Sequence, residues 1–129
     1  MPKTVVYDTR FFLEHYYSRE NSRLQKTKEA IQKAKERFIS AIVLHEIYWL
    51  TLEQEGQETA TIRAGLLEKD FKVVKIDAEI AKNSAQLRHK YRIGIAESII
   101  AATAQALKAT CLSDDPNFKS VDEITTSWI

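Results

Sequence analysis

The segment that most constrains this fold lies at residues 4–7, where Thr4 is followed by two valines and a tyrosine. β-branched and aromatic residues in a row are typical of a buried strand, and the run stops at Asp8, before a segment that is compatible with a helix. Asp8 is therefore predicted at the carboxyl end of a strand, where ligands collect in open parallel sheets. An aspartate can also act there only as the N-cap of the next helix, so both roles remain open for Asp8.

The remainder of the chain alternates between helix-like and strand-like segments. Helices are expected over residues 9–17, 23–36, 41–54, 58–68, 78–90 and 95–109, and strands at 38–40, 71–76 and 110–112, with a last short strand near the carboxyl terminus. The Asp, Asn and Pro residues between 113 and 118 could mark only a turn. This alternation indicates an α/β fold, and 129 residues fit one domain.

Composition excludes several classes of protein without selecting one. The formal net charge of +1 argues against a strongly cationic binder of duplex DNA, although it is compatible with local basic patches. The single cysteine, Cys111, excludes an internal disulfide, and the amino terminus does not resemble a signal peptide. No apolar run approaches the roughly 18 residues needed to cross a bilayer. We therefore expect a cytoplasmic protein that does not enter a membrane.

Three later acidic positions resemble that of Asp8, because they also lie at or beside junctions of strands and helices. They are Glu46, Glu97 and the pair Asp114 and Asp115. Glu46 is either exposed on a narrow polar stripe of an apolar helix or held inward, and inward carboxylates rarely persist without a partner. Glu97 is the only acid of an alanine-rich helix, where the helix dipole favours it in the first turn and where it would also face the crevice beside Asp8.

One crevice shared by these carboxylates is the economical explanation of their positions. Carboxylates held within a few ångströms of one another repel and lose hydration, which costs several kcal/mol unless a cation neutralises them. Oxygen ligands without His or Cys select hard cations, so the pattern indicates Mg²⁺ or Mn²⁺. These ions serve phosphoryl chemistry, because they lower the pKa of a bound water and stabilise a pentacoordinate phosphate.

Two groups of basic residues are candidates for contact with the phosphate backbone of a nucleic acid. One lies on the helix expected over residues 23–36 and the other at the end of the helix expected over residues 78–90. The residues are Lys26, Lys33 and Lys35 in the first group and Arg88 and Arg92 in the second. Basic faces of this kind are more often only solvated, so both interpretations stand.

Together these motifs resemble the PIN domain, in particular the VapC-like toxins. The resemblance rests on Val6-Tyr7-Asp8-Thr9, on Ser40 with Glu46 six residues later, on the run from Glu97 to Ala104, and on Leu112-Ser113-Asp114-Asp115 with Phe118. It implies a single PIN-like domain over residues 1–129, built as a three-layer α/β/α sandwich with a central, mainly parallel sheet. It further implies a Mg²⁺/Mn²⁺-dependent endoribonuclease that acts on RNA, a homodimer, and a cognate antitoxin that blocks the crevice.

The resemblance also assigns roles to single residues. The expected metal ligands are Asp8, Glu97 and Asp115, and Glu46 completes the catalytic acids. The expected supporting residues are Ser113, which would hold a water or the first carboxylate, with Thr9, Ser40 and Asp114. Glu97 stands where the family usually has aspartate, so its carboxylate is displaced by about 1.5 Å or binds through water. Asp114 and Asp115 compete for the fourth acidic position, and the Ser-x-Asp spacing favours Asp115.

Arg10 is a further departure, because members of the family often have a smaller polar residue after Asp-Thr. Its guanidinium would pair with a carboxylate of the site, bind a substrate phosphate, or simply lie on the surface. The leading hypothesis is a metal-dependent ribonuclease that acts as a toxin, and the alternative is a catalytically weak PIN-fold module that binds RNA or a protein partner. A structural domain whose acids only cap helices is the third possibility. Metal-dependent cleavage separates the first from the other two.

Overall fold

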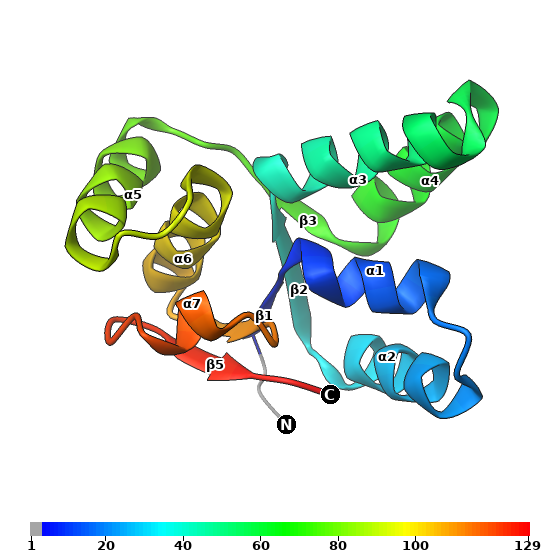
Figure 1. Cartoon of the computed structure of the whole chain (residues 1–129), viewed down its shortest axis with the longest axis horizontal. Coiled ribbons are helices and arrows are strands. Elements are labelled where there is room, and N and C mark those ends of the chain that lie inside the picture. Colours follow the sequence, from blue (N-terminus) through cyan, green and yellow to red (C-terminus); the bar gives the residue numbers. More distant parts are fainter. Residues whose placement is uncertain (1–3) are drawn as a thin grey trace.

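The computed structural model describes residues 4–129, which form five strands and seven helices (Figure 1). In chain order these are β1 (Thr4–Tyr7), α1 (Thr9–Tyr17), α2 (Asn21–Lys33), β2 (Glu36–Ser40), α3 (Ala41–Glu55), α4 (Gln57–Asp70), β3 (Lys72–Val74), α5 (Ala78–Tyr91), α6 (Ile95–Leu107), β4 (Thr110–Leu112), α7 (Pro116–Lys119) and β5 (Thr125–Ser127). The alternation of strands and helices expected from the sequence is therefore present along the chain.

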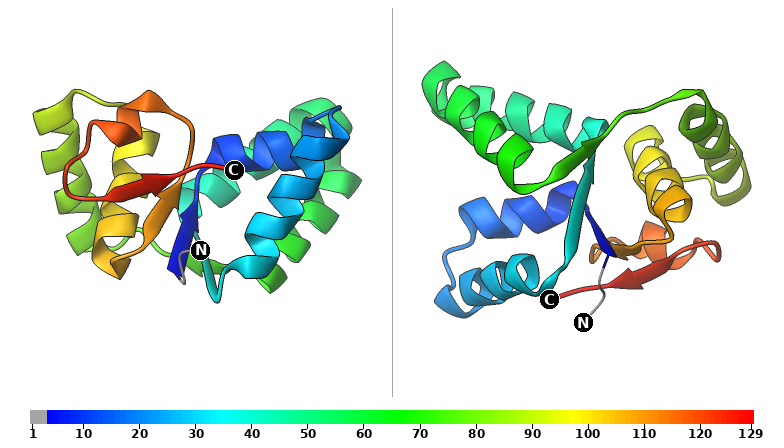
Figure 2. Two further views of the ribbon diagram at one scale, coloured as in Figure 1. Left: turned by 90° about the horizontal axis from the view of Figure 1, so that it is seen from below. Right: turned by 180° about the vertical axis from the view of Figure 1, so that it is seen from behind.

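The strands form one parallel sheet in the order β3-β2-β1-β4-β5, with β1 at its centre. Val6 of β1 pairs with Phe38 of β2 on one side and with Cys111 of β4 on the other. Helices α5 and α6 cover one face of the sheet and α1 to α4 cover the other, as Figures 1 and 2 show from different sides. The predicted three-layer α/β/α sandwich with a parallel central sheet is confirmed. All five carboxyl ends of the strands thus point to the same edge.

The central strand β1 is packed on both faces, and its residues Val5, Val6 and Tyr7 have no exposed surface. Tyr7 packs edge-on against Phe11 of α1 and against Phe71, with ring centroids 4.9 and 5.1 Å away. The hydroxyl of Tyr7 donates a buried hydrogen bond of 3.1 Å to the backbone carbonyl of Ala30 in α2. Apolar packing and this hydrogen bond together hold α1 and α2 against one face of the sheet.

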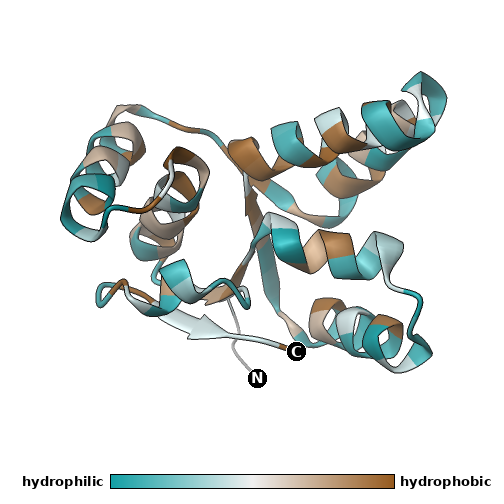
Figure 3. Ribbon diagram, viewed as in Figure 1, coloured by the Kyte–Doolittle hydropathy of each residue, from teal (hydrophilic) through white to brown (hydrophobic). Residues whose placement is uncertain are grey.

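Small side chains let α6 approach the opposite face of the sheet closely. Ala101, Ala102 and Ala104 of this helix have no exposed surface, as expected from its alanine-rich sequence. The first turn of α3 is also strongly hydrophobic (Figure 3), and Ile42 and Leu44 in this turn pack against the same core. This packing sets where the amino ends of α3 and α6 lie at the carboxyl edge of the sheet.

Several element boundaries differ from those expected, and strand pairing accounts for two of the differences. The helix expected over residues 23–36 ends at Lys33, because Glu36 begins β2 and pairs in register with Thr4 of β1. Backbone pairing in the sheet outweighs the helix propensity of this charged segment. The strand expected over residues 71–76 is limited to the three residues of β3, which are the ones that pair with β2.

The carboxyl-terminal part contains one more helix than expected. Residues 116–119, in the segment whose composition could mark only a turn, form the single-turn helix α7. Pro116 is its first residue, and Asp115 caps it by accepting the backbone N–H of Asn117 at 3.0 Å. The last short strand expected near the terminus is β5. Within residues 4–129, none of the helices combines the length and the apolar character needed to cross a membrane.

The hydrogen bond between Tyr7 and Ala30 generates a first prediction. Tyr7→Phe keeps the packing of the ring but removes the donor to a carbonyl in the last turns of α2. We expect the free energy of unfolding, measured by urea denaturation, to fall by about 1–2 kcal/mol. Tyr48→Phe is the matched control, because the hydroxyl of Tyr48 accepts an exposed hydrogen bond from Gln57. Its loss should stay within about 0.5 kcal/mol, and equal losses in both variants would contradict the prediction.

Candidate active site

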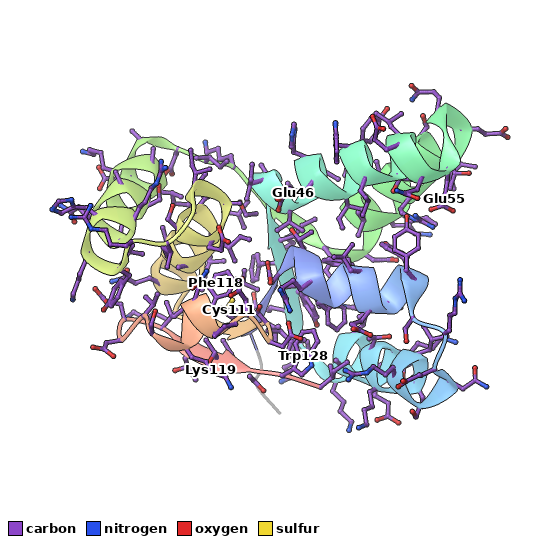
Figure 4. All side chains as sticks on the ribbon, in the orientation of Figure 1. Glu46, Glu55, Cys111, Phe118, Lys119 and Trp128 are labelled. Carbon is purple, nitrogen blue, oxygen red and sulfur yellow. The ribbon has the colours of Figure 1, made fainter. Side chains whose placement is uncertain are left out.

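A hollow at the carboxyl edge of the sheet brings together the four acids that the sequence predicted to share a crevice. It has a volume of about 260 Å³. Its lining residues are Asp8, Thr9, Arg10, Glu46, Ala96, Glu97, Ile100 and Asp115. We call it the acidic hollow. Figure 4 marks Glu46 in the first turns of α3, and the other acids come from the end of β1, the first turn of α6 and the loop after β4.

Asp8 is the most buried of these carboxylates, with 4% of its surface exposed. One of its oxygens accepts the backbone N–H of Thr9 at 2.7 Å, and the other accepts the hydroxyl of Ser113 at 2.6 Å. Burial raises the pKa of Asp8 to about 6, against the opposing effect of these two hydrogen bonds. The negative charges of Asp115 and Glu46 raise this pKa further. Asp8 therefore caps α1 and also faces the hollow, and a ligand-binding role beyond the cap stays a prediction.

Glu46 is half-buried and is held by the residue next to Asp8. The hydroxyl of Thr9 donates a hydrogen bond of 2.6 Å to Oε1 of Glu46, which joins α1 to α3 beside the hollow. Ser40 is fully buried and begins α3, where its hydroxyl accepts the backbone N–H of Ile42 at 3.2 Å. Ser40 therefore acts at a distance from the acidic hollow, by setting the start of the helix that carries Glu46.

Glu97 lies in the first turn of α6, half-buried, where the helix dipole favours its charge. Its carboxylate lies over Gly94, the N-cap of α6, so closely that a Cβ at residue 94 would collide with it. Gly94 is thus needed for this side-chain position and not for its backbone, because its φ of −71° is open to any residue. Gly94 was missed in the sequence, where the available signal is a glycine three residues before an acid.

The loop after β4 connects the remaining acids to this group. Ser113 is buried, and its oxygen accepts the backbone N–H of Asp115 at 3.0 Å while its hydroxyl donates to Asp8. Asp115 lines the acidic hollow. Asp114 instead forms an ion pair of 2.7 Å with Nε of Arg10. Of the three roles considered for Arg10, the structure shows pairing with a carboxylate of this loop.

The two groups of basic residues lie in different places. The first group, on or just after α2, consists of Lys26, Lys33 and Lys35, all exposed. Lys35 precedes Glu36, which pairs with Thr4 at the amino end of β1, so this end of the group lies at the sheet edge opposite the acidic hollow. Arg88 and Arg92 line a separate hollow of about 660 Å³ beside α5 and α6. Contact of either group with nucleic acid stays a prediction.

The donor atoms of the acidic hollow fit a hard divalent cation, since its polar side chains are carboxylates, a threonine and an arginine, without His or Cys. The raised pKa of Asp8 agrees with this fit, because a cation beside Asp8 would favour its charged form. In the part of the chain that the structure describes, however, no three His, Cys, Asp or Glu side chains form a group able to hold a metal ion as they stand. The acids share the hollow without composing a finished ligand set.

Comparison with known proteins agrees with this architecture. Residues 5–124 match the family described as PIN domain, whereas no curated protein matches the chain significantly. A toxin–antitoxin complex from Klebsiella pneumoniae contains a similar chain at 20% identity, with 98% of this chain and 100% of that chain covered and a TM-score of 0.76. A second similar chain occurs in VapBC2 from Rickettsia felis, bound to a DNA fragment from its promoter. It is 17% identical, the match covers 97% of this chain and 98% of that chain, and the TM-score is 0.78.

A third solved structure is VapC20 from Mycobacterium tuberculosis, described as a sarcin-ricin loop cleaving toxin. It is 16% identical, covers 95% of this chain and 99% of its own, and has a TM-score of 0.73. The resemblance to the PIN domain and to VapC-like toxins, inferred from sequence motifs, is therefore confirmed. At these identities the structural likeness by itself establishes a shared fold.

The buried charge of Asp8 generates a prediction that requires no substrate. Because its pKa is 3.8 when unperturbed and about 6 in the folded chain, the folded state loses stability as the pH rises through this range. Asp8→Asn removes this loss. We expect its free energy of unfolding in EDTA to exceed that of the wild type by about 2–3 kcal/mol above pH 6. The difference should vanish below about pH 4, where the carboxyl is protonated in both states.

Asp77→Asn is the matched control for this measurement. Asp77 is exposed outside the acidic hollow and caps α5 by accepting the backbone N–H of Ile80 at 2.9 Å. This variant should be neutral or slightly destabilised, since Asn caps a helix about as well as Asp but lacks its charge. Millimolar Mn²⁺ should stabilise the wild type more than Asp8→Asn. If the two variants respond alike to pH and to Mn²⁺, Asp8 only caps its helix.

Proposed function

This chain belongs to the PIN domain family, and from that premise we propose that it is a Mg²⁺- or Mn²⁺-dependent endoribonuclease that hydrolyses RNA phosphodiester bonds. We also propose that it is the toxin of a toxin–antitoxin pair. The observation that carries the proposal is the convergence of four carboxylates, from four segments of the chain, on one hollow at the carboxyl edge of a parallel sheet. PIN domains are typically nucleases, and phosphodiester hydrolysis is chemistry that such a set of acids supports with a divalent cation.

The residues of the acidic hollow divide into ligands and residues that position them. The proposed cation ligands are Asp8, Glu97 and Asp115. When bound, the cation would lower the pKa of a water and stabilise negative charge on the phosphate. Glu46 is the fourth catalytic acid, and Thr9 holds its carboxylate through Oε1. Ser113 holds Asp8 in the same way, so two hydroxyl groups orient two acids without neutralising their charge.

Structural relatives support the proposed substrate and partners. VapC20 from M. tuberculosis is described as a toxin that cleaves the sarcin-ricin loop, and the relative from K. pneumoniae was solved as a toxin–antitoxin complex. By analogy with these relatives, we propose that this chain acts on RNA and is inhibited by a cognate antitoxin. The homodimer that we also propose follows from the family resemblance of the sequence motifs. The guanidinium of an arginine forks well onto paired carboxylates, so we expect the antitoxin to present an arginine to the acidic hollow.

One observation favours a second candidate, a catalytically weak PIN-fold module that binds RNA or a protein partner. Among the described residues, the acids of the hollow do not compose a group that could hold a metal ion as they stand. The carboxylate of Glu97 lies over Gly94, at the amino end of its own helix. A module of this kind would bind its partner without cleaving RNA, whatever the cation. Cleavage is therefore the property that distinguishes the two candidates.

The nuclease proposal predicts that the purified protein cuts mixed RNA in Mn²⁺ and leaves it intact in EDTA, as read on a denaturing gel. Asp8→Asn and Glu97→Gln should each lower the initial rate by about a hundredfold or more, because each removes an anionic ligand of the cation. Glu58→Gln is the matched control, since Glu58 is an exposed acid in the first turn of α4. It should keep the wild-type rate. Cleavage that persists in EDTA or in both site variants would contradict the proposal, and intact RNA with wild type and Mn²⁺ would favour the binding module.

The toxin proposal predicts a short, basic antitoxin encoded beside this chain. Expression of the chain alone should arrest growth, and co-expression with the neighbouring small protein should restore it. Asp8→Asn expressed alone should be harmless, because growth arrest requires the acidic hollow, whereas Asp77→Asn should remain toxic. Purification from the native source should recover the partner together with this chain. A chain that is harmless alone and is recovered without a partner is not a toxin of this kind.

A further inference from the structure

A second hollow, larger than the acidic hollow, lies beside α6, the helix that carries Glu97. Its volume of about 660 Å³ is within the range of roughly 300–1,000 Å³ that is usual for ligand sites. It lies between α5 and the first turns of α6, and we call it the α5–α6 pocket. Its apolar wall includes Ile76, Ile95 and Ile99, and its basic side chains include Arg88 and Arg92.

The α5–α6 pocket is cationic, since none of its lining residues is acidic. Arg88 and His89 belong to the last turn of α5, and Arg92 follows that helix. Among the described residues, no carboxylate lies within ion-pair distance of either arginine, whereas Lys90 between them pairs with Glu123 at 3.3 Å. Cations at a carboxyl-terminal helix end interact favourably with the helix dipole. The dipole therefore accounts for the presence of basic residues at this helix end. Arg92 differs from Arg88 and His89 in its backbone conformation.

Arg92 ends α5 in the left-handed conformation, with φ 57° and ψ 36°. Glycine is the usual residue at such a helix end, because a Cβ makes the left-handed backbone conformation less stable. An arginine thus occupies a position where glycine would give the more stable helix end. Lys108 does the same at the end of α6, with φ 52°, but it lines a different hollow, which also contains Glu123. Arg92 and Lys108 are therefore a matched pair of strained cations, by which we mean basic residues with a strained, left-handed backbone. Of the two, Arg92 lines the α5–α6 pocket and Lys108 does not.

The apolar wall of the pocket is open to solvent. Ile95 is 61% exposed and Ile76 is 39% exposed, next to the two free arginines. Apolar side chains suit the flat face of a nucleobase, and guanidinium groups suit phosphate oxygens. An apolar wall with cations and no acid therefore fits a nucleotide better than it fits an uncharged ligand.

The two hollows share the first turns of α6. Ala96, Glu97 and Ile100 line the acidic hollow, and Ile95, Ser98 and Ile99 line the α5–α6 pocket. Successive residues of a helix point about 100° apart, so these two sets lie on nearly opposite sides of the same turns, at the amino end of α6. A strand with one phosphate at Glu97 therefore reaches the α5–α6 pocket by crossing the amino end of α6, a distance of about one helix diameter, roughly 10 Å.

We propose that the α5–α6 pocket binds the nucleotide next to the scissile phosphate of a single-stranded RNA. The base of this nucleotide packs on Ile76 and Ile95, and its phosphate is bound by Arg88 and Arg92. The inference rests on the proposed function, because that function places the scissile bond at the acidic hollow. It assigns to this pocket the choice of base beside the cleavage point, because the acidic hollow is lined mainly by polar side chains.

The matched pair of strained cations gives the first test. Arg92→Gly and Lys108→Gly each remove one positive charge and one left-handed side chain, so both should raise the melting temperature. Binding of a labelled single-stranded RNA is measured by fluorescence anisotropy in EDTA, at several salt concentrations. Arg92→Gly should weaken binding roughly fivefold to tenfold and lower the slope of log affinity against log salt by about 0.7–1. Lys108→Gly should leave the RNA affinity and its salt slope unchanged.

The apolar wall has its own matched pair. Ile95→Ser and Ile62→Ser each remove an isoleucine of similar exposure, 61% and 58%, but only Ile95 lines the α5–α6 pocket. Ile95→Ser should weaken RNA binding roughly tenfold with an unchanged salt slope, because the lost contact is apolar. Ile62→Ser should bind as the wild type does.

Equal effects of Arg92→Gly and Lys108→Gly on RNA binding, or no effect of either, would overturn the proposal. Size-exclusion chromatography with light scattering checks the alternative occupants. If Arg92→Gly or Ile95→Ser turns a dimer into a monomer and keeps RNA affinity, the pocket is covered by a second copy of the chain. If either variant loses only an acidic protein partner, the pocket binds a peptide. Wild-type protein that binds RNA but never cuts it in Mn²⁺ contradicts the proposed function instead, and the paired variants then still decide where the RNA binds.

Discussion

A carboxylate buried at the end of the central strand is the constraint on which the rest of this structure depends. Asp8 accepts hydrogen bonds from Thr9 and Ser113, so β1, α1 and the loop after β4 meet at one point. Burying its charge costs free energy that these hydrogen bonds offset only in part, as its pKa of about 6 indicates. A helix cap would serve as well in an exposed position, as Asp77 does. The burial of Asp8 among other acids is therefore better explained by a function of the carboxylate group.

The sheet order then determines which acids join Asp8. Because β1 is central, the helices that begin at its carboxyl edge on the two faces, α3 and α6, bring Glu46 and Glu97 to the same hollow. Thr9 joins α1 to α3 through Glu46, and Gly94 leaves room for the carboxylate of Glu97. The same first turns of α6 present Ile95 on the other side of the helix, beside a cationic pocket. One helix end therefore links the proposed cleavage site to the proposed nucleotide pocket.

Local sequence determined the type and the approximate position of most elements, together with the four acids of the site. Hydrophobic periodicity and capping act over a few residues, so they can be read without the fold. The run before Asp8 predicted β1, and the alanine-rich segment with one acid predicted a buried helix with Glu97 near its start. The positions of acids at junctions, combined with the common edge of parallel strands, were sufficient to predict that they meet.

Tertiary structure alone decided which residues pair and on which side of the sheet they lie. Glu36 belongs to a strand because Thr4 lies opposite it in the register, a contact across more than thirty residues that no local pattern encodes. The basic residue Lys35 is thereby placed at the edge opposite the acidic hollow. Asp115 faces the hollow and Asp114 faces Arg10 because the loop after β4 turns between them. Local propensities act within one turn or strand, whereas these positions depend on long-range backbone pairing and close packing, which exist only in the folded chain.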